Sequence, residues 1–168
     1  MIYVSSKNLV HRDLRAQNVL VNRSRQVKIA DFGLTNYATN ANQVEQRMKV
    51  KFPVKWTAPE SQGTHNYTEK SDIWSFAVMI FEVMTHGQTP YPDYKGEKLN
   101  TLKNDIINGF RMPKPIECSD HVYNFMLDCW NLDPEKRPSF IETGTFFETL
   151  TADSEIDYCD ADTDSVTL

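Results

Sequence analysis

The sequence has 168 residues, enough for one domain with its own core, and its 40% hydrophobic and 24% charged composition is typical of a soluble globular protein. The formal net charge of −5 comes from the last eighteen residues, which hold six acids and no bases (Asp153, Glu155, Asp157, Asp160, Asp162 and Asp164). The near-neutral remainder gives no support for nucleic-acid binding, and the longest apolar run, residues 73–84, is too short and too polar to cross a bilayer.

A polar turn and a hairpin are the first elements that the sequence predicts. Residues 1–10 are expected to be the end of a helix that leads into the turn at residues 11–18. Two short β-prone runs, at residues 19–21 and 27–30, are joined by a polar turn and predict a β-hairpin. Because a hairpin folds back on itself, it would bring Asp31, just past its second strand, beside Asn18, just before its first.

The turn and the hairpin would thereby place three oxygen-bearing side chains close together, those of Asp13, Asn18 and Asp31. The Asn18 amide oxygen and the Asp31 carboxylate would form a half-site that Mg²⁺ accepts, with water and substrate phosphates as its remaining ligands. Asp13 stands five residues before Asn18 and is free of the metal. It can therefore receive the proton of an attacking hydroxyl group.

These residues resemble a known family, the protein kinases. Any one of the triplets occurs by chance in solvated loops, but four linked motifs in the right order favour the family. The four are His11-Arg12-Asp13, Asn18 five residues after Asp13, Asp31-Phe32-Gly33, and Ala58-Pro59-Glu60. Leu14-Arg15-Ala16 and the segment at residues 52–57 resemble the tyrosine-specific kinases, and Arg15 directly after Leu14 resembles their Src-type cytoplasmic branch.

The resemblance implies a fold and a domain organisation. It covers residues 1–150 and implies a mainly α-helical fold with short β-hairpins (α+β), the C-terminal lobe of a tyrosine kinase domain. The N-terminal lobe is expected to be absent, because the sequence has no G-x-G-x-x-G and no room before His11 for the lysine that pairs the nucleotide phosphates. Residues 151–168 are small and acidic and are expected to be a disordered tail.

The resemblance also implies an activity with ATP and Mg²⁺, the transfer of a γ-phosphoryl group to a tyrosine of a protein substrate. Asp13 would be the catalytic base, Arg15 would lie near the transferred group, and Asn18 and Asp31 would hold the metal and its nucleotide. Structural roles would fall to six further residues: His11, Phe32, Gly33, Glu60, Asp72 and Arg137. Among these, Asp72 would bond the backbone of the catalytic turn, and Arg137 would pair with Glu60.

Residues 34–57 are polar and resemble an activation loop. Its only tyrosine, Tyr37, lies close behind Gly33, whereas the family usually carries a tyrosine in mid-loop. A phosphorylated loop tyrosine would pair with Arg12. At the end of the loop, Pro53 and Trp56 would support the substrate tyrosine; without the neighbouring motifs, the same segment would be an ordinary turn with a buried tryptophan.

The remaining chain is predicted to be helical. A helix from Glu69 to Gly87, capped by Thr68, has scarcely any polar face and must be buried in the middle of the domain. Later apolar stripes predict three more helices, one ending at Gly109, one capped by Ser119 and one from Pro138 to Leu150. In the tail, Tyr158 resembles the inhibitory tyrosine of Src-type kinases and, when phosphorylated, a ligand for SH2-containing proteins. The alternative is a plain solvated tail.

Two functional hypotheses follow from the sequence. In the first, the parent protein is a non-receptor tyrosine kinase. In the second, the chain on its own is catalytically inactive and docks substrates or partners, or binds an SH2 domain through Tyr158; a poorly folding fragment is a third possibility. The odd number of cysteines indicates a reducing compartment, so the expected location is the cytoplasm, with the inner membrane surface reached through N-terminal parts outside this sequence.

Overall fold

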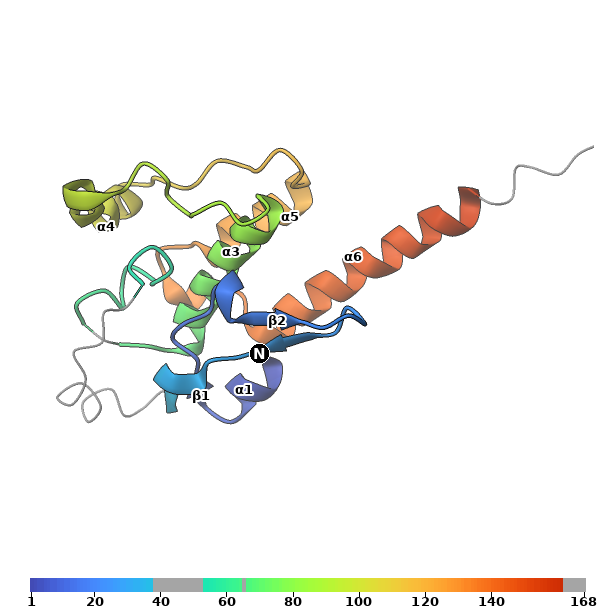
Figure 1. Ribbon diagram of the computed structural model, residues 1–168, viewed down its shortest axis with the longest axis horizontal. Helices are drawn as coiled ribbons and strands as arrows, with labels where there is room; N and C mark the ends of the chain where they lie inside the picture. Colours follow the sequence, from blue (N-terminus) through green and yellow to red (C-terminus); the bar gives the residue numbers. More distant parts are fainter. Residues whose placement is uncertain (38–52, 65, 162–168) are drawn as a thin grey trace, which may run out of the picture.

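The structure is a computed structural model that describes residues 1–37, 53–64 and 66–161, with side chains described to residue 151 except that of Tyr37. The described part is mainly helical and carries two small antiparallel sheets (Figure 1). The predicted α+β class is therefore confirmed. Within these residues, no helix combines the length and the apolar character that crossing a membrane requires.

The N-terminal part forms both sheets. The predicted hairpin is present, with Val19 opposite Ile29 and Val21 opposite Val27. A second pairing was not predicted, because each of its strands has only two residues; it sets Leu9 opposite Tyr37 and returns the chain to its start. The elements in order are α1 (Ile2–Ser6), β1 (Leu9–Val10), η1 (Ala16–Asn18), β2 (Val19–Val21), β3 (Val27–Ile29), η2 (Phe32–Leu34) and β4 (Asn36–Tyr37).

Helix α3 (Glu69–Met84) runs through the centre of the fold (Figure 1). It begins where the sequence predicts, with the Thr68 N–H donating to Ser71 Oγ, and several of its apolar side chains are fully buried. It ends earlier than expected, because His86 adopts a left-handed conformation (φ 54°) and the Gly87 N–H turns back to the Glu82 carbonyl (2.7 Å). The prediction of a buried central helix is confirmed.

The C-terminal part consists of η3 (Gly96–Thr101), α4 (Leu102–Ile107), α5 (Asp120–Cys129), η4 (Pro134–Lys136) and α6 (Phe140–Ala161). The predicted cap of α5 is present, since Ser119 Oγ accepts from the Val122 N–H (3.2 Å). Gly144 lies where α6 meets α1, and a Cβ atom there would lie 2.9 Å from Ile2 Cδ1. A glycine inside α6 therefore allows the close approach of the two helices.

Helix α6 is longer than the sequence indicated. Its backbone stays helical beyond Leu150 as far as Ala161 and projects away from the body (Figure 1). Residues 151–161 contain no glycine or proline, so nothing in them ends the helix. The expected disordered tail therefore does not describe the backbone of residues 151–161, and residues 162–168 lie outside the described part.

Candidate active site

The polar turn is fixed to the central helix by one buried carboxylate. Asp72 Oδ2 accepts from the His11 N–H at 2.6 Å, and its Oδ1 accepts from the Arg12 N–H at 2.9 Å. These are the contacts that the family resemblance implied for Asp72. Burial raises the pKa of Asp72 to about 7, against the opposing effect of the two N–H groups and the Arg12 charge. The same contacts hold Arg12 in a left-handed conformation (φ 70°), which is unfavourable without such support.

His11 connects the turn to the second motif. Its Nδ1 accepts from the Asp13 N–H (3.3 Å), so the ring proton is on Nε2, which donates to the Ala30 carbonyl (3.1 Å). Burial lowers the pKa of His11, which agrees with a neutral ring. The Phe32 ring packs edge-to-face against His11 at 4.9 Å between centroids. His11 and Phe32 thus join the turn to the end of the hairpin.

The Asp13 carboxylate is covered by neighbouring side chains. It is only 6% exposed, and the Asn18 side-chain nitrogen donates to its Oδ2 at 2.8 Å. Arg15 Nε lies 3.1 Å from Asp13 Oδ1, an ion pair that is not aligned as a hydrogen bond. Arg15 and Asn18 thus cover the Asp13 carboxylate, as expected because a buried carboxylate without partners is costly.

Asn18 and Asp31 are brought together by the hairpin. The Ala30 N–H donates to the Asn18 carbonyl (2.8 Å), which extends the strand pairing by one residue and places Asp31 next in the chain. The Asn18 side-chain nitrogen faces Asp13, so its amide oxygen is the atom available to a cation. Asp31 is exposed in a left-handed conformation (φ 61°), with Oδ1 accepting from the Gly33 N–H (3.3 Å).

An amide oxygen and an exposed carboxylate are hard donors of the kind that Mg²⁺ binds. No group of three or more His, Cys, Asp and Glu side chains suited to a metal occurs in the described part of the chain. These two residues therefore fit a metal that takes its other ligands from phosphate and water, and do not form a complete cage.

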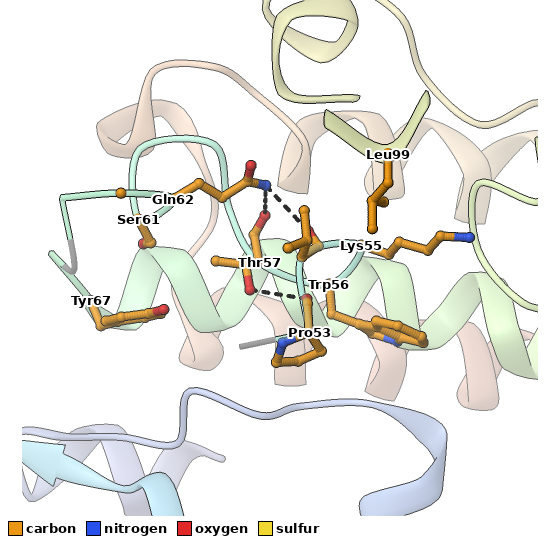
Figure 2. Close-up of a pocket in the computed structure, with 10 residues that line it drawn as sticks. Pro53, Lys55, Trp56, Thr57, Ser61, Gln62, Tyr67 and Leu99 are labelled. Atoms are coloured by element: carbon orange, nitrogen blue, oxygen red, sulfur yellow. Dashed lines mark hydrogen bonds between the residues drawn. The ribbon is translucent and has the colours of Figure 1, made fainter. Parts of the chain in front are cut away.

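The expected substrate residues line a cavity of about 570 Å³ (Figure 2). Pro53 and Trp56 lie in its wall beside Leu99, which comes from η3. Hydrogen bonds hold this wall: Gln62 Nε2 donates to the carbonyls of Thr57 (2.8 Å) and Val54 (3.2 Å). Sequence reasoning assigned Leu99 only to the apolar stripe of the helix that ends at Gly109 and gave Gln62 no role, because their places in this wall depend on chain segments that meet only in the fold.

Glu82 is a functional candidate that sequence reasoning missed. It appeared there only as an interruption of an apolar run, yet its Oε2 accepts from Trp56 Nε1 and from the Ala16 N–H, each at 2.9 Å. The signal was available, because a carboxylate in a helix with scarcely any polar face must find partners when it is buried.

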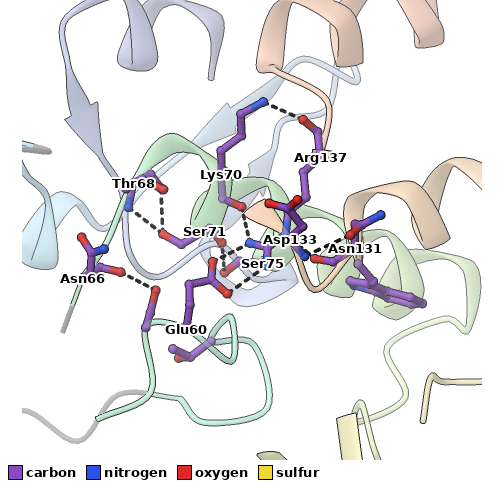
Figure 3. Close-up of polar contacts among 12 residues, drawn as sticks. Glu60, Asn66, Thr68, Lys70, Ser71, Ser75, Asn131, Asp133 and Arg137 are labelled. Carbon is purple, nitrogen blue, oxygen red and sulfur yellow. Dashed lines mark hydrogen bonds and ion pairs between the residues drawn. The ribbon is translucent and has the colours of Figure 1, made fainter. Parts of the chain in front are cut away.

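The predicted pair between Glu60 and Arg137 is present and bidentate (Figure 3). The two N–O distances are 2.6 and 2.8 Å, and Arg137 is almost completely buried. Arg137 also donates to the Lys70 and Asn131 carbonyls, and Lys70 Nζ donates to the Arg137 carbonyl. These contacts tie the end of the substrate segment to α3 and to the entrance of α6.

The regulatory residues are only partly described. Arg12 is buried, with its guanidinium 4.9 Å from the ring centroid of Tyr67. Tyr37 is described by its backbone in β4, and Tyr158 by its helical backbone in α6. The middle of the expected activation loop, residues 38–52, lies outside the described residues. The regulatory roles stay predictions.

Comparison with known proteins agrees with these motifs. Residues 1–147 match the family described as "Protein tyrosine and serine/threonine kinase". Human tyrosine-protein kinase ABL2 is 43% identical over 93% of this chain, human tyrosine-protein kinase FRK 41% over 83%, and the tyrosine-protein kinase receptor torso of Bombyx mori 45% over 84%. The chain spans 13%, 28% and 17% of the lengths of these three relatives.

Proposed function

Because the chain belongs to the protein tyrosine kinase family, we propose that it is the metal- and substrate-binding lobe of a non-receptor tyrosine kinase of the Src-type branch. The reaction is the transfer of the γ-phosphoryl group of ATP to a tyrosine hydroxyl of a protein. The observation that carries the proposal is that the Asn18 side chain contacts Asp13, while the hairpin pairs the Asn18 backbone with Ala30, the residue before Asp31.

Asn18 and Asp31 would hold Mg²⁺ with the nucleotide phosphates. When bound, Mg²⁺ supplies neutralisation of the phosphate charge. The orientation of the Asn18 amide supports this role, because its nitrogen is occupied by Asp13. Asp31 supports it because its carboxylate is exposed and the backbone bond from Gly33 fixes its direction.

Asp13 would accept the proton of the tyrosine hydroxyl. The phenolic oxygen forms a bond to the γ-phosphorus, the bond from that phosphorus to the bridging oxygen of ADP breaks, and the proton passes to the Asp13 carboxylate. A phenol of pKa about 10 need not ionise beforehand, because the transition state is loose and the proton is transferred late. Arg15 covers Asp13 Oδ1 and must move aside for the hydroxyl to approach.

The cavity beside Pro53 and Trp56 would receive the substrate chain around its tyrosine. Its mostly apolar wall, fixed by Gln62, suits a flat aromatic ring and the residues next to it. Positioning of this kind is the main contribution that a protein can make to phosphoryl transfer.

The test measures phosphate transfer from ATP to a Glu/Tyr copolymer, by the chain alone and after its fusion behind the small lobe of a related tyrosine kinase. Transfer by the fusion, abolished by Asp13→Asn, supports the proposal. The matched control is Asp128→Asn on the exposed face of α5, which should leave transfer unchanged. Equal activity of the fusion and its Asp13→Asn variant would remove Asp13 from the mechanism.

A second function, peptide docking without transfer by the chain alone, is favoured by the ion pair over Asp13. In this state Arg15 covers the proposed base, while the cavity beside Pro53 and Trp56 is present. Fluorescence anisotropy of a labelled Glu/Tyr peptide without ATP separates the two functions. Binding without transfer by the chain alone supports docking, and transfer by the chain alone contradicts it.

Two finer assignments belong to the same proposal. The protein would act in the cytoplasm, at the inner membrane surface where parts outside this sequence attach it. Phosphorylated Tyr158 would bind an SH2 domain of a partner or of the same protein. Its position in the helical backbone of α6 means that this end of the helix must unwind to present it as an extended ligand.

A further inference from the structure

One carboxylate of α3 joins two segments that are far apart in the sequence. Glu82 is 9% exposed, and a single oxygen, Oε2, accepts both the Ala16 N–H of the catalytic turn and Trp56 Nε1 of the cavity wall, each at 2.9 Å. A buried carboxylate surrounded by apolar neighbours is costly unless it is paired. Here both donors belong to segments that would carry the reaction.

The catalytic turn and the cavity wall also meet without Glu82, through Arg15 and Trp56. Ala16 follows Arg15, whose guanidinium lies 5.9 Å from the Trp56 ring centroid and whose Nε lies 3.1 Å from Asp13 Oδ1. Asp13 thus contacts Arg15, Arg15 contacts Trp56, and Trp56 bonds to Glu82. Glu82 in turn bonds to Ala16, which follows Arg15 in the chain. Displacing Glu82 therefore changes the position of Trp56 relative to Asp13.

Trp56 has one further tie to α3. Its carbonyl accepts from Ser75 Oγ at 2.8 Å, so the backbone of Trp56 is held independently of its indole. Loss of Glu82 should therefore leave the segment attached while freeing the direction of the indole ring. The ring is part of the cavity wall, so the change should reach the bound peptide directly.

We propose that Glu82 is a positioning residue that sets the distance between the catalytic turn and the substrate cavity. The inference rests on the proposed function, because it takes the cavity as the peptide site and Asp13 as the base. Glu82 does not line the cavity and acts through Trp56 and through Arg15, the neighbour of Ala16.

The variants are chosen to separate its two bonds. Glu82→Ala removes both, Glu82→Gln keeps a weaker acceptor of nearly the same size, and Trp56→Phe keeps an aromatic ring but lacks the indole N–H. Val83→Ala, at the next and exposed position of α3, is the matched control. Thermal unfolding is recorded for all four, and Glu82→Gln serves as the test variant if Glu82→Ala does not fold.

Three readouts are taken. Hydrogen exchange at the Trp56 indole N–H and the Ala16 amide is followed by NMR in the chain, binding of a labelled Glu/Tyr peptide is measured by anisotropy, and kcat and KM are measured in the small-lobe fusion. We expect Glu82→Ala to accelerate exchange at both groups. We also expect peptide binding about tenfold weaker or more, the range for losing a charge-assisted hydrogen bond, with KM for ATP unchanged.

The remaining variants complete the expected pattern. The exchange rates and the peptide affinity of Glu82→Gln should lie between those of the unsubstituted chain and those of Glu82→Ala. Val83→Ala should have the same exchange rates and peptide affinity as the unsubstituted chain. Adding Trp56→Phe to Glu82→Ala should weaken binding no further, because Glu82→Ala has already removed the indole bond that Trp56→Phe removes.

Faster exchange with unchanged peptide binding would overturn the inference, since Glu82 would then only support the fold. Absence of peptide binding by the unsubstituted chain would overturn it as well. If the chain binds peptide but the fusion does not transfer phosphate, the proposed function fails, and the Glu82 inference is decided by binding alone.

Discussion

The side-chain nitrogen of Asn18 donates to both the backbone carbonyl and Oδ2 of Asp13, at 2.8 Å each. These two hydrogen bonds orient the side chains of two candidate functional residues. They hold the Asp13 carboxylate in place, and they leave the Asn18 amide oxygen as the atom available to a cation. The residue proposed to hold the metal therefore also orients the proposed base.

Asn18→Ala should destabilise the protein by about 2 to 3 kcal/mol, because the buried Asp13 loses two hydrogen bonds, one of them to its charge. Chemical denaturation measures the change. Asn124→Ala, at an exposed position of α5, is the control and should lie within about 0.5 kcal/mol of the unsubstituted chain. Equal effects of the two substitutions would mean that the Asn18 contacts do not contribute to stability.

Asp72 should make the stability depend on pH. Its pKa rises from 3.8 in the unfolded chain to about 7 in the fold, so folding takes up a proton between these values. The stability contributed by the protonated group is fully present below pH 4 and is lost as the pH rises through 7. His11, whose pKa burial lowers, acts with the opposite sign.

The free energy of unfolding in urea is measured as a function of pH for the unsubstituted chain and for Asp72→Asn. Because both proteins keep His11, the difference between their free energies reports the titration of Asp72. The free energy difference between the two should narrow as the pH rises from 4 to 7. A constant difference across that range would show that Asp72 keeps one protonation state.

Arg137→Ala should cost about 3 to 5 kcal/mol, because it removes a fully buried guanidinium together with its bidentate pair to Glu60 and its bonds to the Lys70 and Asn131 carbonyls. Arg137→Lys should recover only part of the loss, since an ammonium group cannot form the paired hydrogen bonds. Lys136→Ala, at the exposed neighbouring position, is the control. Full recovery by lysine would indicate that charge alone, without the planar geometry, accounts for the contact.

Gln62→Ala should weaken peptide binding several-fold without changing the KM for ATP, because the carbonyls of Val54 and Thr57 lose the amide that joins them. Gln62→Glu should behave in the same way, since a carboxylate has no hydrogen to donate to a carbonyl. Peptide anisotropy and ATP-dependent kinetics are the measurements, with Gln88→Ala as the control. Normal binding by Gln62→Glu would contradict the proposed contact.

Local patterns were enough to predict much of this fold. The hairpin is readable because its two β-prone runs flank a polar turn, and the central helix is readable because it lacks a polar face. The contacts of Asp72 and of Glu60 with Arg137 were predicted from the family resemblance, and both are present. Each of these features rests on a few neighbouring residues or on a motif at fixed spacing.

Other features depend on contacts between distant segments. The pairing of Leu9 with Tyr37 involves strands too short to have a pattern, and the cover of Arg15 over Asp13 depends on Trp56 behind it. Glu82 was missed because its two partners lie in different segments. In each case the function of a residue is set by what the fold places beside it.

The most direct test of the account is phosphate transfer by the small-lobe fusion as a function of Mg²⁺ concentration, for the unsubstituted chain, Asp31→Asn and Asp13→Asn. If Asp31 holds the metal and Asp13 takes the proton, Asp31→Asn should need much more Mg²⁺ and recover part of its activity at high concentration. Asp13→Asn should remain inactive at every concentration. Recovery of Asp13→Asn by Mg²⁺, an unchanged Mg²⁺ requirement of Asp31→Asn, or no transfer by the unsubstituted fusion would contradict it.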